Sequence, residues 1–258
     1  MFRFAKTLSI AALALAAALG AAAAKDWKTI RIGTEGAYPP FNNLNAKGEL
    51  EGFEIDYAKA LCAKMKAECT FVAQDWDGII PALLTSKFDA IIASMSITDE
   101  RAQKVAFTDA YYATPASVIG PKGAAGADIS PAAMKGKTLG GQGSTTHANY
   151  MEKTYKDSVL KLYKTQDEAN LDLASGRLDF VIADKVVLGD FIKGDGKACC
   201  KFIADIPRDV SVFGTGVGAA LRKEDGDLRA LFNKAIAEAK ADGTFKKLQD
   251  KYFDFDIN

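Results

Sequence analysis

The sequence predicts an α/β fold made of two lobes that face one ligand cleft. Predicted strands and helices alternate along the chain, which is typical of α/β proteins. Residues 84–93 resemble residues 174–183: each segment reads as a helix end, a turn, an aspartate and an apolar strand. Polar residues follow both strands, and ligands of α/β sheets bind beyond the carboxyl ends of strands. Chance similarity between two ordinary helix–strand units is the alternative explanation of the repeat.

The first half of the chain supplies the elements of one lobe. Residues 29–32 alternate polar and apolar side chains, as a half-buried strand does. Residues 54–66 place apolar side chains at helical spacing. The other elements predicted here are strands at 69–72 and 89–93 and a short helix at 79–86, with a proline in its first turn.

The second half repeats this plan. Residues 137–139 begin a strand that ends in the glycine-rich stretch 140–143, and a helix at 145–155 follows. Residues 224–252 are mostly helical, with apolar side chains on one face. The other elements predicted here are strands at 159–163 and 179–183 and a helix at 166–174.

Composition and charge exclude several functional classes. The 258 residues include 33 Lys+Arg and 33 Asp+Glu, a balance that argues against a basic nucleic-acid-binding protein. A single histidine, His147, disfavours a histidine-rich metal site, and the cysteines lack a recognisable zinc-ligand spacing. We therefore expect no metal ion, no cofactor and no nucleic-acid partner.

The first 24 residues have the pattern of a secretory signal peptide. Arg3 and Lys6 form a short basic region, residues 8–19 form an apolar run, and small residues precede residue 25. A membrane anchor is the alternative, but the run is short for a span of about 20 residues. No cysteine stands at the cleavage site for lipid attachment. We expect a soluble exported protein.

Export favours disulfide bonds. Cys62 and Cys69 lie at the end of a predicted helix and at the start of the next strand, so they are a disulfide candidate. Two buried thiols are the alternative. Cys199 and Cys200 are reduced, bonded to each other or used between molecules, and the sequence leaves these three possibilities open.

Candidate binding residues follow the predicted strands. Residues 140–146 join a strand to a helix, where free N–H groups and hydroxyls favour an anion, although a plain tight turn is the alternative. Arg101 can hold a carboxylate or lie on the surface. Asp184 can accept an ammonium or cap a helix. Tyr38 and Trp76 can flank a ligand side chain or pack in the core. Together they outline a site for a free α-amino acid.

Residues 25–258 resemble, over nearly their whole length, the periplasmic solute-binding proteins of ABC transporters for polar amino acids. They are most similar to the lysine/arginine/ornithine, histidine and opine binding proteins. The stretches that carry the resemblance are IGTEGAYPPF at 32–41, GFEID at 52–56, DWDGIIP at 75–81, SMSITDER at 94–101, QGST at 142–145, SGRLD at 175–179, GTGVG at 214–218 and DGT at 242–244.

The resemblance implies a two-lobed periplasmic-binding-protein fold of the type II-like class. Lobe 1 would comprise residues 25–113 and 214–258, and lobe 2 residues 114–213. Two hinge crossovers, near 113–117 and 212–215, would join the lobes around the ligand cleft.

The resemblance also implies roles for the groups that hold the ligand backbone. Arg101 would bind the ligand carboxylate together with main-chain N–H groups at Ser96 and Thr145. Asp184 would bind the α-ammonium together with Ser94 and Ser96.

The side chain of the ligand would lie between Tyr38 and Trp76, and Glu35 would receive its distal cationic group. Two positions depart from the basic-amino-acid branch: Ala93 replaces a frequent serine, and Thr146 replaces a glutamine. The full predicted set of ligand-binding residues is Glu35, Tyr38, Trp76, Ser94, Met95, Ser96, Arg101, Gln142, Ser144, Thr145, Thr146 and Asp184.

The implied function is capture of a cationic amino acid by hinge closure, followed by delivery to a membrane permease. We expect a periplasmic monomer that is not an enzyme, because no nucleophile–base pair stands out. The Cys62–Cys69 bridge also matches the basic-amino-acid branch. Three alternatives stay open: an opine-binding protein, an enzyme of the cyclohexadienyl dehydratase type and a sensor that feeds no transporter.

Overall fold

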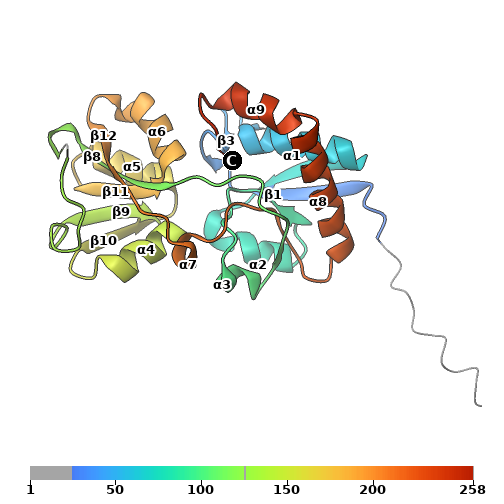
Figure 1. The fold of residues 1–258 in the computed structure, drawn as a ribbon, viewed down its shortest axis with the longest axis horizontal. Helices are drawn as coiled ribbons and strands as arrows, with labels where there is room; N and C mark the ends of the chain where they lie inside the picture. Colours follow the sequence, from blue (N-terminus) through green and yellow to red (C-terminus); the bar gives the residue numbers. More distant parts are fainter. Residues whose placement is uncertain (1–24, 125, 258) are drawn as a thin grey trace, which may run out of the picture.

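The computed structural model describes residues 25–124 and 126–257, so the predicted signal peptide at 1–24 lies outside the described residues. Figure 1 shows two lobes side by side, each built on a five-stranded sheet with helices on both faces. None of the helices in the described ranges is both long and apolar enough to span a membrane.

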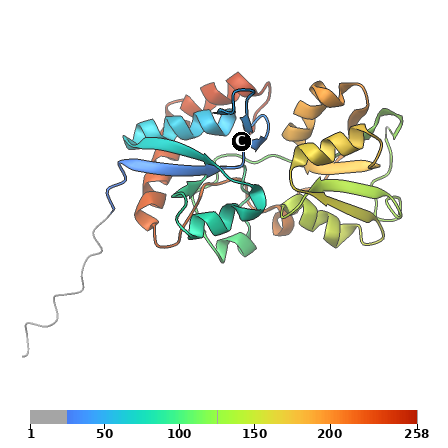
Figure 2. The same cartoon turned by 180° about the vertical axis from the view of Figure 1, so that it is seen from behind.

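The sheet of the first lobe has the strand order β5-β1-β6-β13-β7. Strand β1 (Thr29–Thr34) pairs in parallel with β5 (Glu68–Ala73) and β6 (Ala90–Ile91). Strand β13 (Ala220–Leu221) runs antiparallel to β6 and to β7 (Ala106–Phe107). Seen from behind in Figure 2, β1 and β5 lie side by side across this lobe.

Helices cover both faces of this sheet. Figure 1 shows α1, α8 and α9 on one face and α2 and α3 on the other. Their bounds are α1 Phe53–Met65, α2 Ile79–Leu84, α3 Asp99–Ala102, α8 Gly226–Ala241 and α9 Thr244–Tyr252. A small sheet of β2 (Ala37–Tyr38), β3 (Asn42–Leu44) and β4 (Leu50–Glu51) precedes α1.

The sheet of the second lobe has the order β10-β9-β11-β8-β12. Strands β10 (Val159–Tyr163), β9 (Thr138–Gln142) and β11 (Phe180–Asp184) are parallel. Strand β8 (Ala116–Pro121) runs antiparallel to β11 and to β12 (Cys200–Asp205).

The helices of the second lobe begin at side chains that cap them. Helices α4 (Thr146–Thr154) and α5 (Gln166–Ala174) begin after Thr145 and Thr165, whose hydroxyls accept N–H groups of the first turn. Helix α6 (Lys185–Lys193) follows β11 directly. The short helix α7 (Val210–Phe213) lies on the way back to the first lobe.

The chain passes between the two sheets twice, after β7 and again after β12. The two connections are hydrogen-bonded to each other, because Val217 N donates to the Tyr112 carbonyl at 2.8 Å. Gly214 has a φ of +77°, and a Cβ there would lie 2.1 Å from the Ile97 carbonyl oxygen. The returning connection therefore needs glycine at this position.

Two predicted elements are shorter in the structure. Residues 89–93 form a strand only at Ala90–Ile91, since only Ile32 and Gly33 of β1 pair with them. The helix predicted at 79–86 ends at Leu84, and the φ of +61° at Ser86 is incompatible with its continuation. The mostly helical region predicted at 224–252 is confirmed, and it is divided into α8 and α9 at Gly243, which has a φ of +80°.

The predicted Cys62–Cys69 disulfide is confirmed, and it joins α1 to β5 with the two Cα atoms 6.1 Å apart. Cys199 and Cys200, which the sequence left open, are bonded to each other. The described residues therefore contain no free cysteine.

Replacing both Cys62 and Cys69 by alanine is expected to lower the free energy of unfolding by about 2–3 kcal/mol, because the crosslink restricts the unfolded chain. Urea unfolding measured without reductant tests this. The matched control is the Cys199→Ala/Cys200→Ala pair, whose crosslink between neighbours closes almost no chain and should change stability less. An equal loss in both double variants would contradict the assignment of the stabilisation to the α1–β5 crosslink.

Candidate functional site

Two cavities meet between the lobes and share walls formed by Tyr38, Ser94, Ser96, Thr146 and His147. The larger has a volume of about 270 Å³. The smaller has a volume of about 30 Å³, which is roughly the volume of one water molecule. Asp184 lines the larger cavity. The smaller cavity is lined further by Glu35, Trp76, Ala93, Arg101, Gln142 and Thr145.

The structure brings ten of the twelve predicted residues to these cavities and leaves out Met95 and Ser144. Met95 is fully buried in the core of the first lobe, in a cluster with Ile79 and Val105. Ser94 and Ser96 line both cavities, whereas Met95 packs in this core. Ser144 is an exposed residue, and its carbonyl accepts the indole N–H of Trp76.

Arg101 has a half-buried guanidinium that lacks an anionic partner. The guanidinium donates to the carbonyls of Ser96, at 3.0 Å, and of Ser144, at 3.3 Å. Its central carbon lies 5.2 Å from the centre of the Trp76 ring. Burial lowers the pKa of Arg101 to about 10. Among the residues that the structure describes, no carboxylate forms an ion pair with it, so the guanidinium is available to an external carboxylate.

Asp184 combines the two roles that the sequence left open. It ends β11 and caps α6, where its carboxylate accepts the N–H of Val186 at 2.8 Å. Its other oxygen accepts the hydroxyl of Thr114. The same carboxylate lines the larger cavity, and burial raises its pKa to about 6. No cation pairs with it in the described part of the chain, so it can accept an ammonium group.

Glu35 is a second buried carboxylate, with 8% of its surface exposed. It accepts a hydrogen bond of 2.5 Å from the side-chain amide of Gln142, which belongs to the other lobe. Burial raises the pKa of Glu35 to about 7. An unpaired carboxylate in such a place favours binding of a cation, which would stabilise its charged form.

The two lobes are in contact across the cleft. Trp76 Nε1 donates to the Ser144 carbonyl at 3.0 Å, and Lys164 forms an ion pair of 2.7 Å with Asp75. The guanidinium of Arg101, in the first lobe, also donates to the Ser144 carbonyl at 3.3 Å. These contacts hold the lobes closed and leave the smaller cavity narrow.

The sequence did not indicate three residues of the site. His147 lines both cavities, and burial together with the nearby Arg101 lowers its pKa to about 4. Thr114 holds Asp184, and Glu54 lies behind Ser94. His147 could have been noticed from the sequence, because it is the chain's single histidine and lies next to a predicted anion-binding stretch. No sequence pattern marks Thr114 or Glu54 as a site residue, because their contacts join residues that are far apart in sequence.

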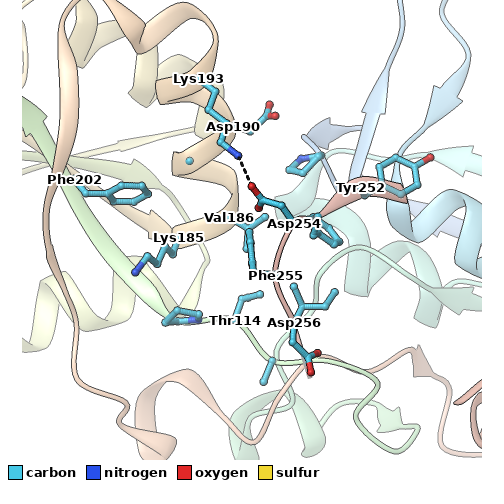
Figure 3. Close-up of a pocket in the computed structure, with 16 residues that line it drawn as sticks. Thr114, Lys185, Val186, Asp190, Lys193, Phe202, Tyr252, Asp254, Phe255 and Asp256 are labelled. Carbon is cyan, nitrogen blue, oxygen red and sulfur yellow. Dashed lines mark ion pairs between the residues drawn. The ribbon is translucent and has the colours of Figure 1, made fainter. Parts of the chain in front are cut away.

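A further cavity of about 400 Å³ lies between α6 and the C-terminal segment, and none of the twelve predicted residues lines it. Figure 3 shows Lys193 of α6 reaching toward Asp254, with which it forms an ion pair of 3.9 Å. Both side chains are largely exposed, so this pair adds little stability. The main chain of Ile257 accepts the N–H of Ala113, which ties the C-terminal segment to the first connection between lobes.

The raised pKa of Glu35 predicts how stability depends on pH. Between its ordinary value and about 7, the folded protein keeps a proton that the unfolded chain releases, so this group makes stability fall as pH rises. The lowered pKa of His147 acts in the opposite direction between about 4 and its ordinary value of 6.5. The contribution of Glu35 is therefore best measured against Glu35→Gln.

From pH 5 to pH 8, we expect wild type to lose on the order of 2–3 kcal/mol of unfolding free energy relative to Glu35→Gln, without ligand. Denaturant unfolding of both proteins at several pH values measures this difference. A difference that does not change with pH would mean that Glu35 keeps an ordinary pKa in the folded protein.

Comparison with known proteins agrees with this geometry. Residues 30–255 match the family of bacterial extracellular solute-binding proteins, family 3. The chain is 45% identical over 233 residues to the L-arginine-binding protein of Pseudomonas aeruginosa, across 89% of this chain and 90% of that protein. It is 42% identical over 258 residues to the lysine/arginine/ornithine-binding periplasmic protein of Escherichia coli, across 96% and 98% of the two chains.

A solved structure of an ancestral arginine-binding protein bound to arginine has a TM-score of 0.81 and 36% sequence identity. The match covers 88% of this chain and 98% of that one. The predicted family resemblance and the predicted two-lobed α/β fold are both confirmed.

Proposed function

The chain belongs to the bacterial extracellular solute-binding proteins of family 3, and on that premise we propose that it captures a cationic α-amino acid, arginine above all. The observation that carries this proposal is the charge pattern of the cleft. Arg101 lacks an anionic partner, and Asp184 and Glu35 are buried carboxylates without cationic partners in the described residues. A basic amino acid supplies one carboxylate and two cations, so it can pair with all three groups.

The residues that would hold the ligand come from both lobes. Glu35, Trp76 and Arg101 belong to the first, and Asp184 and Thr145 to the second. A ligand that contacts both lobes binds the closed state better than the open one and therefore favours closure. The two connections between the sheets would act as the hinge, with the lobe boundaries at 113–114 and 213–214.

The proposed protein is periplasmic and passes its ligand to the permease of an ABC transporter. The relative from Escherichia coli is a periplasmic protein, and the relatives named above are binding proteins rather than enzymes. Asp184 would be paired with the ligand ammonium and would not serve as the general acid that a dehydratase needs.

Titration calorimetry of the exported protein, after removal of bound ligand by unfolding and refolding, tests the proposal. Arginine, lysine, ornithine, histidine, glutamine, glutamate and octopine are compared under one set of conditions. We expect arginine to bind with micromolar or tighter affinity and to remain chemically unchanged. Tighter binding of octopine would favour an opine-binding protein, turnover of a cyclohexadienyl substrate would favour an enzyme, and binding of none would overturn the proposal.

A further inference from the structure

Glu54, in the first turn of α1, is a completely buried carboxylate next to the proposed ammonium site. It accepts the N–H of Ser94 at 2.7 Å and the Ser94 hydroxyl at 3.0 Å. It also accepts the hydroxyl of Tyr111 at 2.8 Å and the side-chain amide of Asn42 at 3.1 Å, and the Tyr112 oxygen lies 3.3 Å away. Its neighbours are therefore hydrogen-bond donors on every side.

The direction of these hydrogen bonds is fixed. The carbonyl oxygen of the Asn42 side chain accepts the N–H of Gly36 at 2.8 Å, so its NH₂ group faces Glu54. The backbone N–H of Ser94 can only donate. Burial raises the pKa of Glu54, and the hydrogen bonds from Tyr111, Ser94 and Asn42 oppose that shift. These obligatory donors match an ionised carboxylate, which has only acceptor atoms. Glu54 consequently takes the hydroxyl proton of Ser94.

Ser94 is left with lone pairs and no proton to offer. The Tyr112 hydroxyl lies 2.9 Å from the Ser94 oxygen and occupies one acceptor position. The remaining acceptor position of the Ser94 oxygen is free for a ligand, because Ser94 lines both cavities. Such an oxygen binds an ammonium group and repels a carboxylate oxygen.

Glu54 also supports an unusual backbone conformation. Ser94 has a φ of +51°, in the left-handed region that residues other than glycine rarely adopt. Its N–H is held by the Glu54 carboxylate, a charge-assisted hydrogen bond that stabilises this turn. The turn follows β6 and brings Ser94 and Ser96 to the cavity wall.

We propose that Glu54 is a positioning residue for the α-ammonium of the ligand: it fixes Ser94 as a hydrogen-bond acceptor and places a negative charge behind the ammonium. The inference rests on the proposed function. It adds a third acidic residue to Asp184 and Glu35, so three acidic side chains in and behind the site face two arginines, Arg101 and Arg208, that line the cavities. This excess favours a ligand with a net positive charge.

The test compares arginine with 5-guanidinopentanoate, which is arginine without its α-ammonium. In wild type we expect the analogue to bind roughly 10³-fold more weakly, because its binding leaves Asp184 and Ser94 unpaired. In Glu54→Gln we expect this ratio to fall about tenfold or more, through weaker binding of arginine and little change for the analogue. A merely structural role for Glu54 would weaken both ligands equally and leave the ratio unchanged.

Two further variants serve as controls. Glu35→Gln changes the other end of the site and should weaken both ligands while leaving their ratio near the wild-type value. Tyr111→Phe removes a hydrogen bond to Glu54 without touching Ser94, so it measures the loss of stability alone. If Glu54→Gln shows no cooperative unfolding transition, Glu54→Asp replaces it, because the shorter side chain withdraws the carboxylate from Ser94 and should also lower the ratio.

A ratio within twofold of wild type in a folded Glu54 variant overturns this inference and leaves the proposed function standing. Failure of wild type to bind arginine overturns the proposed function, and the inference fails with it. Calorimetry of wild type alone therefore distinguishes the two failures.

Discussion

Arg101→Ala is expected to abolish measurable binding of every α-amino acid. The guanidinium lines the smaller cavity and forms no ion pair with a described residue, so it can hold the ligand carboxylate through two parallel hydrogen bonds. Removing one partner of a desolvated charge pair costs on the order of 2–5 kcal/mol, which is roughly a 30- to 5,000-fold loss of affinity. Titration calorimetry with arginine measures the effect.

The same substitution should leave the ligand-free protein at least as stable as wild type, because it removes a half-buried cation that has no anionic partner. Arg177→Ala is the matched control: Arg177 is an exposed arginine that pairs with Asp172 on the far lobe, and its loss should leave binding unchanged. Affinity for arginine close to wild type in Arg101→Ala would refute the assigned role. A loss of stability equal to the loss of binding would indicate a structural role instead.

Glu35→Gln is expected to remove the preference for cationic side chains. Wild type should bind arginine, lysine and ornithine more tightly than glutamine, because only a cation compensates the buried carboxylate. In the variant, arginine should lose on the order of 2–5 kcal/mol of binding free energy, while glutamine changes little. A glutamine at this position can still bond to Gln142, so the contact between lobes need not be lost.

Competition binding with glutamine and arginine measures this change in preference. Glu152→Gln, which alters an exposed carboxylate of α4, is the control for the loss of one negative charge and should keep the wild-type order of ligands. Unchanged arginine affinity in Glu35→Gln would show that Glu35 does not contact the ligand side chain. Glutamine as the tightest ligand of wild type would place the protein among binders of neutral amino acids.

Local sequence patterns predicted the elements that alternate along each lobe. Short segments carry these patterns: residues 29–32 alternate with a period of two, and residues 54–66 have helical spacing. The structure has strand β1 and helix α1 at nearly those positions. Strands β7 and β13 were not predicted, because each has two residues and is defined only by pairing with a distant partner. Strand β8 was not predicted either, and nothing in its own sequence indicates which strand it joins.

The residues of the candidate site also divide into those that local sequence indicates and those that depend on distant contacts. Residues that follow strands, such as Asp184, could be identified because strand ends converge at one edge of a sheet. The sequence could not exclude Met95, because the φ of +51° at Ser94 breaks the alternation of side chains that an extended segment would have. Glu54 was not identifiable, because an acidic residue in the first turn of a helix is ordinarily explained by the helix dipole. Its burial depends on Tyr111 and Tyr112, which lie more than fifty positions away.

The hydrogen bond from Trp76 to the opposite lobe makes closure of the cleft visible in the protein's own fluorescence. The chain has two tryptophans, and the other, Trp27, packs against the core of the first lobe beside Lys25. Opening would separate Trp76 from the Ser144 carbonyl and hydrate its indole, which shifts the emission to longer wavelength. An unlabelled sample in a stopped-flow instrument can therefore report the rate of closure, with Trp76→Phe as the silent reference.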